Sequence, residues 1–168
     1  MAQERLITQI DYARAGKITP QMEAVAAKEH KTPEEIRAGV VKGCIAIPAN
    51  IHHAALSPEG VGEGMRTKVN VNLGISGDLM NAEMELEKVR TAIELGAEGI
   101  MDLSNHGKTH DFRKHLIDMS PAMIGTVPMY DAIGYLEKPL IGITAQDFLD
   151  VVRAHAEDGV DSVSYTHL

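Results

Sequence analysis

The chain has 168 residues, of which 44% are hydrophobic and 24% charged, enough for a domain with a buried core. Its 16 basic and 24 acidic residues give a formal net charge of 16 − 24 = −8 at pH 7, which disfavours a nucleic-acid partner because phosphate binding needs a concentrated basic footprint. The single cysteine, Cys44, excludes a disulfide framework or a thiolate metal cluster built from this chain alone.

Targeting signals are not evident in the sequence. The N-terminus lacks a signal-peptide pattern, and no apolar run approaches the ~18 residues of a membrane span. We therefore expect a cytoplasmic protein without a membrane partner. The expected state of Cys44 is a buried, inert thiol.

Residues 1–58 predict helices followed by an irregular segment. Thr19 and Thr32 each place a capping hydroxyl directly before a proline, and Glu35 completes a capping box with Thr32. The segment that follows is rich in Pro, Asn and Gly, as loops are. The predicted elements are helices at 20–29 and 33–42 and a loop at 49–60.

From residue 67 onward, strand patterns alternate with helix patterns. The strands show polar–apolar alternation or short apolar runs, whereas the helices carry apolar residues three or four positions apart. Thr144 caps the last helix through Asp147, and 131–143 has no clear pattern. The predicted strands are 67–74, 98–103, 122–130 (ended by Pro128) and 160–165, and the predicted helices are 81–95, 109–119 and 144–159.

An even pitch relates three residues near the C-terminal ends of these strands. Asn72, Met101 and Tyr130 follow one another at intervals of 29 residues. Evenly pitched βα units imply parallel strands joined by right-handed helical crossovers, as in a doubly wound sheet or a (β/α)8 barrel. Four strands cannot close such a barrel, so the chain would hold half of one.

Parallel α/β proteins bind ligands at the C-terminal ends of their strands, which makes polar residues there the first candidates. Asn72 offers donors and acceptors to a ligand, although an asparagine that bonds its own turn is an equal alternative. For Asp102, a structural role at the strand ends is favoured over a base or cation partner. The candidates are Asn70, Asn72, Asp102, Ser104 and Tyr130.

Two histidine pairs raise the alternative of a metal site. His106 and His110 have i,i+4 spacing, but neither they nor His52 and His53 belong to an H-E-x-x-H motif. Adjacent histidines rarely both face one ion. Solvated loop histidines are therefore the favoured interpretation.

Six stretches of the sequence, in order, resemble the phosphomethylpyrimidine synthase (ThiC) family over residues 12–161. These are ARAGKITPQMEAVA, IPANIHH, GMRTKVNVNLG, GAEGIMDLS, SPAMIGTVPMYDA and AEDGVD. The resemblance implies a radical S-adenosylmethionine enzyme, a carbon–carbon lyase that converts aminoimidazole ribotide to hydroxymethylpyrimidine phosphate in thiamine biosynthesis. It also implies a homodimer, a 4Fe–4S cluster held by a three-cysteine motif, and zinc held by two histidines.

The family fold implied is a (β/α)8, TIM-like barrel followed by a small C-terminal domain. On this basis the chain divides into a helical and irregular segment at 1–58, the first half of the barrel at 59–161, and an atypical, foreign-looking tail at 162–168. The cluster cysteines and zinc histidines would lie outside this chain. We therefore expect the fragment to be inactive alone, and to aggregate or remain molten because half a barrel exposes sheet edges.

Three substrate contacts of the family fall on matching motifs: Asn72 in NLG, Met101 in IMDLS and Tyr130 in VPMY. The resemblance implies that Asn72 and Tyr130 hydrogen-bond the ribotide and that Met101 offers it a soft apolar surface. None of the three is implied to be an acid or a base; the chemistry would be the cofactor's.

Two departures keep other functions open. Val71 stands where common family members have alanine, and 104–107 reads SNHG where they have residues like STGG. A paralogous branch, 5-hydroxybenzimidazole synthase, uses the same ribotide to make a cobalamin lower-ligand precursor and is the first alternative. The second is a non-catalytic, ribotide-binding fragment.

Overall fold

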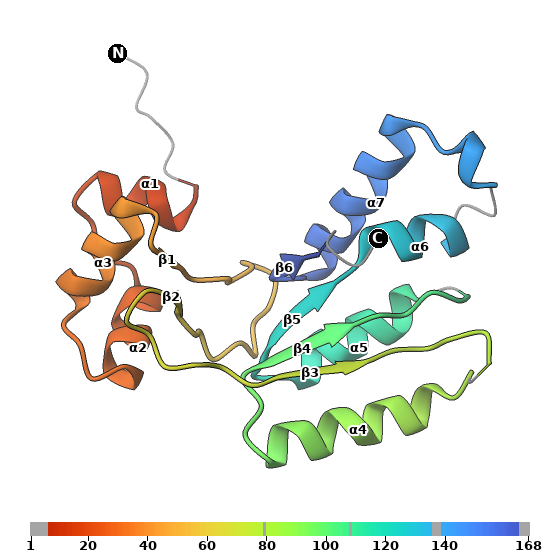
Figure 1. Cartoon of the computed structure of the whole chain (residues 1–168), viewed down its shortest axis with the longest axis horizontal. Coiled ribbons are helices and arrows are strands. Elements are labelled where there is room, and N and C mark those ends of the chain that lie inside the picture. The colour runs from red at the N-terminus through yellow and green to blue at the C-terminus, as the bar shows by residue number, and fades with distance from the viewer. Residues whose placement is uncertain (1–6, 79, 108, 136–138, 165–168) are drawn as a thin grey trace. The chain divides into compact units, whose positions relative to one another are not determined.

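The computed structural model describes residues 7–78, 80–107, 109–135 and 139–164 (Figure 1), so most of the atypical tail expected at 162–168 lies outside the described residues. The chain divides into two compact units, one formed by residues up to 48 with 57–67 and the other by 49–56 with residues from 68 onward. The boundary drawn from sequence after residue 58 thus falls inside a segment that belongs to the first unit. Within the described ranges, none of the helices has both the length and the apolar character needed to cross a membrane.

The first unit is helical, with one small two-stranded sheet. The Thr19 hydroxyl accepts a hydrogen bond from the Met22 N–H, and Thr32 and Glu35 form the predicted capping box. The two predicted helices are confirmed, whereas α1 and the antiparallel pair β1–β2 were not predicted. The elements are α1 (Gln9–Arg14), α2 (Pro20–Lys28), α3 (Pro33–Lys42), β1 (Ile45–Ala46) and β2 (Val61–Gly62).

Cys44 is exposed, so the prediction of a buried thiol is wrong. The next residue, Ile45, is buried in β1 against Gly39 and Gly60. Cys44 lies in the short connection between α3 and β1, outside the strand in which Ile45 is buried.

The second unit is a parallel α/β structure, as the alternating pattern predicts. Its four strands lie in chain order and every neighbouring pair is parallel. The described strands do not form a closed barrel. The strands are β3 (Asn70–Leu73), β4 (Gly99–Asp102), β5 (Met123–Thr126) and β6 (Ser162–Val163), and the helices are α4 (Ala82–Glu94), α5 (His110–Met119), α6 (Pro128–Tyr135), the short 3-10 helix η1 (Leu140–Gly142) and α7 (Ala145–Asp158).

The two faces of this sheet differ in character. Apolar residues of β3, β4 and β5, with one residue just before β5 and one before β6, pack with residues of α4 and α5 in one core. Its residues are Leu73, Leu86, Val89, Ile100, Phe112, Leu116, Ile117, Ala122, Ile124 and Val160. The alternate strand positions point the other way. That second face carries Asn70, Asn72, Met101 and Gly125, and we call it the open face.

The third strand is shorter than predicted. β5 ends at Thr126, and Pro128 is the first residue of helix α6 and not part of the strand. Proline suits the first helical position, where its missing N–H has no intrahelical partner. The segment 131–143, which showed no pattern in the sequence, therefore contains most of α6 and the 3-10 helix η1.

Candidate functional site

Asn72 and Met101 lie side by side on the open face. They are register partners on the neighbouring strands β3 and β4. The Asn70 side-chain Nδ2 donates to Asn72 Oδ1 at 2.8 Å. This bond fixes the orientation of the Asn72 amide and uses one lone pair of its Oδ1. The Nδ2–H donors and the second lone pair remain for a ligand.

Gly125 makes room for the Met101 thioether. The two residues are register partners on β4 and β5, and a Cβ built on Gly125 would lie 2.8 Å from Met101 Cε and 3.0 Å from Met101 Sδ. These separations are shorter than van der Waals contact, so only glycine leaves the Met101 side chain where it is. Together, Asn72, Met101 and Gly125 form one continuous row across three strands.

Tyr130 is not part of that row. It lies in the first turn of α6, half-buried, with its backbone N–H donating to the Val127 carbonyl at 3.0 Å. The 29-residue pitch thus identifies two residues that the sheet brings together and a third that it does not. Gly125 takes the place in the row that the pitch assigned to Tyr130, because β5 ends before Tyr130 is reached.

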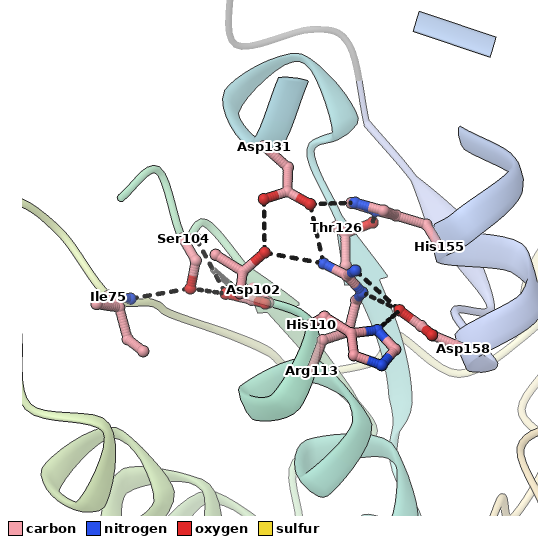
Figure 2. A network of polar contacts seen from close by, with 10 residues as sticks. Ile75, Asp102, Ser104, His110, Arg113, Thr126, Asp131, His155 and Asp158 are labelled. Atoms are coloured by element: carbon pink, nitrogen blue, oxygen red, sulfur yellow. Dashed lines mark hydrogen bonds and ion pairs between the residues drawn. The ribbon is translucent and has the colours of Figure 1, made fainter. Parts of the chain in front are cut away.

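Asp102 and Ser104 tie the ends of β3 and β4 together. Asp102 Oδ1 accepts hydrogen bonds from the Ser104 hydroxyl and from the Ser104 N–H at 2.9 Å. Ser104 Oγ in turn accepts from the Ile75 N–H at 2.9 Å (Figure 2). Burial raises the pKa of Asp102, against the opposing effects of the Ser104 hydrogen bonds and the nearby Arg113 charge. This geometry fits the structural role favoured from sequence.

A buried arginine on α5 joins two further carboxylates. Arg113 donates through Nε to Asp158 Oδ2 at 2.8 Å and through Nη1 to Asp131 Oδ2 at 3.1 Å (Figure 2). Its Nη1 also donates to Thr109 Oγ1 at 3.1 Å. His110, on the same helix, lies 3.0 Å from Asp158 Oδ2 through Nδ1. The guanidinium therefore links α5 to both α6 and α7.

Asp131 is the other centre of this network. Burial opposes ionisation, yet hydrogen bonds from His155 and Thr109, together with the Arg113 charge, lower the pKa of Asp131. His155 Nε2 lies 2.8 Å from Asp131 Oδ2, and its Nδ1 lies 2.8 Å from Thr126 Oγ1. Sequence reasoning missed Arg113, Asp131 and His155, because spacing alone does not reveal that a charged residue on an amphipathic helix points inward.

The histidines follow two different patterns. His106 is exposed in the loop after β4, in agreement with the loop interpretation. His53 is buried, so a solvated loop position is wrong for this residue: its Nδ1 lies 2.7 Å from Asp161 Oδ2 and its Nε2 lies 2.8 Å from the Ser120 carbonyl oxygen. Among the residues that the structure describes, no group of three or more His, Cys, Asp or Glu side chains is arranged to hold a metal ion.

The model of the radical SAM ThiC family matches residues 8–167 of this chain. The chain belongs to this family. Three curated relatives are named phosphomethylpyrimidine synthase: those of Alkaliphilus metalliredigens (62% identical, covering 94% of this chain and 36% of the relative), Clostridioides difficile (58%, 94% and 36%) and Clostridium tetani (60%, 92% and 34%). The chain thus spans about a third of the length of these ThiC relatives.

The radical SAM chemistry of the ThiC family implies S-adenosylmethionine and an iron–sulfur cluster. The residues present do not fit such a cluster: the whole sequence has one cysteine, and that residue, Cys44, is exposed in a different unit from the row of Asn72 and Met101. Within the described ranges, this chain offers no alternative grouping of metal ligands either.

Proposed function

We propose that this chain forms part of the substrate site of a phosphomethylpyrimidine synthase, the enzyme that converts aminoimidazole ribotide to hydroxymethylpyrimidine phosphate in thiamine biosynthesis. The observation that carries the proposal is the in-register pair of Asn72 and Met101 on the open face. Both residues stand in the motifs through which the chain resembles the family. Relatives with 57–62% identity and the name phosphomethylpyrimidine synthase support the same reaction.

In this proposal Asn72, Met101 and Tyr130 each make a different contact with the substrate. Asn72 donates from its Nδ2 to an acceptor on the ribotide, in the orientation that the bond from Asn70 to its Oδ1 gives the amide. Met101 supplies a polarizable apolar surface, and the Tyr130 hydroxyl provides a further hydrogen bond. None of them exchanges a proton with the substrate. The 4Fe–4S cluster, S-adenosylmethionine and zinc are assigned to the complete enzyme, not to these residues.

The proposal extends to the architecture of the complete enzyme. A groove of about 370 Å³ lies beside the outer strand β3 and is lined by Val71, Met84, Lys88, Ala92 and Leu95, among others. Leu95 is exposed, and so is Val69, which directly precedes β3. An apolar groove at a sheet edge supports continuation of the sheet into a (β/α)8 barrel, whose further units would cover it. A cytoplasmic homodimer is part of the same proposal.

The test is substrate binding and product identity in the complete enzyme that contains these residues. Aminoimidazole ribotide is titrated calorimetrically, and the product is identified by mass spectrometry. Asn72→Ala and Met101→Ala are each expected to weaken ribotide binding roughly tenfold, the loss of one hydrogen bond or of part of an apolar contact. Met84→Ala is the matched control, because Met84 is also half-buried but lies on α4.

Three results would overturn the proposal in different ways. Failure of the wild-type enzyme to bind ribotide removes the substrate assignment. A 5-hydroxybenzimidazole product keeps the substrate and replaces the reaction by that of the paralogous branch. Equal weakening of binding by Met84→Ala and Met101→Ala removes the open face as the binding surface.

A further inference from the structure

Asp131 directly follows Tyr130 in the first turn of α6, and three donors from outside that helix hold its carboxylate. Thr109, just before α5, donates its hydroxyl to Asp131 Oδ1. Arg113 of α5 and His155 of α7 lie 3.1 and 2.8 Å from Oδ2 (Figure 2). Asp131 itself is only 5% exposed. Both oxygens of this carboxylate are thus held by residues that α6 does not contain.

The donors are themselves held in place. Arg113 binds Asp158 through Nε and Nη2, both at 2.8 Å, so its guanidinium plane has one orientation and Nη1 points to Asp131. On the other side, the His155 ring is fixed by Thr126 Oγ1 on its second nitrogen. An ionised Asp131 only accepts hydrogen bonds, so the Nε2 of His155 carries the proton of this bond.

Two features hold the backbone around Tyr130 in place. One is the short link to β5, where the Tyr130 N–H bonds the Val127 carbonyl. The other is the neighbouring carboxylate of Asp131, with its three donors. A shift of α6 away from α5 and α7 would break these bonds and carry Tyr130 with it. Side chains outside α6 thus contribute to where Tyr130 lies.

We propose that Asp131 is a positioning residue, which holds Tyr130 at the substrate site through its bonds to Thr109, Arg113 and His155. This inference rests on the proposed function, because it requires Tyr130 to contact the ribotide. The carboxylate of Asp131 lies in the buried network, and the proposal gives it no contact with substrate.

The test compares Tyr130→Phe, Asp131→Asn and the double variant in the complete enzyme. In Asp131→Asn the new side chain would aim an NH₂ group at donors that now meet an acceptor, so α6 is expected to shift. Both single variants should raise the KM for ribotide roughly three- to tenfold, with a smaller change in kcat, in line with the loss of one hydrogen bond. The double variant should match Tyr130→Phe alone, because a displaced tyrosine has no hydroxyl bond left to lose.

Asp161→Asn is the matched control. It also removes the charge of a buried carboxylate, but the partners of Asp161 are His53 and the N–H groups of Asn50 and Ile124, outside the network around Arg113, so it should lower Tm without changing the KM. If the two single effects multiply in the double variant, or if Asp161→Asn raises the KM as much as Asp131→Asn does, positioning by Asp131 is refuted. Absence of ribotide binding by the wild type would instead refute the proposed function.

A second pair of variants keeps the inference testable if Asp131→Asn does not fold. His155→Gln retains a donor near the position of Nε2, whereas His155→Leu removes it. The KM should stay near the wild-type value for the glutamine variant and rise for the leucine variant. Equal KM values for the two variants would contradict the proposal.

Discussion

His53 Nδ1 and Asp161 Oδ2 lie 2.7 Å apart, and neither side chain has any exposed surface. The second ring nitrogen of His53 faces the Ser120 carbonyl oxygen at 2.8 Å. Both partners are acceptors, so the fully protonated ring satisfies both. Asp161 also accepts from the backbone N–H groups of Asn50 and Ile124. The pair therefore joins the loop around residue 53 to the sheet.

This pair predicts a pH-dependent stability. Burial alone would lower the pKa of His53, but Asp161 and the Ser120 and Ile117 carbonyls outweigh it, and the pKa rises above its ordinary value of 6.5. The folded protein then holds more protons than the unfolded chain, so this stabilisation is complete below pH 6.5 and is lost as the pH rises through the folded pKa. His53→Ala should lower the free energy of unfolding by about 3 kcal/mol at about pH 6, and by less at about pH 9. Urea denaturation across this pH range measures the difference.

His52→Ala serves as the control for that measurement, because His52 is the exposed neighbour of His53. Its effect should stay within about 0.5 kcal/mol at every pH, as for most surface substitutions. A His53→Ala effect that grows with rising pH would contradict a charged, buried ring.

Ser104→Ala should lower the free energy of unfolding by an amount that depends on pH. The hydroxyl serves both the Ile75 N–H and Asp102, and its loss leaves a buried donor unpaired at a cost of about 1–3 kcal/mol. Since the Ser104 bonds lower the pKa of Asp102 against burial, that pKa should rise further in the variant. Because its pKa is raised, the Asp102 carboxyl keeps its proton to a higher pH in the folded protein than in the unfolded chain. Stability is then lost as the pH rises from about 3.8 to the folded pKa, and this window extends upward in the variant.

Unfolding free energies of wild type and Ser104→Ala between about pH 4 and 7 test this prediction. Ser76→Ala, at a half-buried serine near the end of β3, is the control. A constant difference between Ser104→Ala and wild type over the whole range would show that Asp102 is not affected through Ser104.

The sequence predicted what is encoded locally and missed what depends on distant partners. Thr19, Thr32 and Thr144 cap their helices as expected, because capping involves residues three positions apart. The burial of His53 depends on Asp161, which lies 108 residues further along the chain. No local pattern contains that information.

The candidate site shows the same division. The even pitch placed Asn72 and Met101 near the ends of neighbouring parallel strands, and the sheet brings them into register. Their role as substrate contacts is implied by the family resemblance and stays a prediction. The place of Tyr130 was missed because Pro128 was interpreted as the end of a strand, although proline equally begins a helix. The 29-residue pitch matches the register of β3 and β4 but not that of β4 and β5, where Met101 is the register partner of Gly125.

Gly125→Ala should separate substrate binding from stability. The added methyl group would meet the end of the Met101 side chain and the Ser162 hydroxyl, both of which can rotate away at little cost, so Tm should fall by only a few degrees. The displaced thioether should nevertheless weaken ribotide binding roughly three- to tenfold, by loss of apolar contact. Gly142→Ala is the control, because its Cβ would make only ordinary contacts of 3.7 Å or more with Pro139. Unchanged binding in Gly125→Ala would exclude the thioether as a ligand contact.

Asn70→Ala should act on the ligand only through Asn72. Asn70 is exposed, and its Nδ2 fixes the Asn72 amide by a 2.8 Å bond to Oδ1. Without it, the Asn72 amide can present either end to the ribotide, and affinity should fall roughly two- to tenfold, the range expected for one exposed hydrogen bond. In an Asn72→Ala background the same substitution should have no further effect, because there is no amide left to orient. Calorimetric titration of the four proteins completes the cycle. A further loss of affinity in the double variant would mean that Asn70 contacts the ribotide directly, and the role of orienting Asn72 would then be wrong.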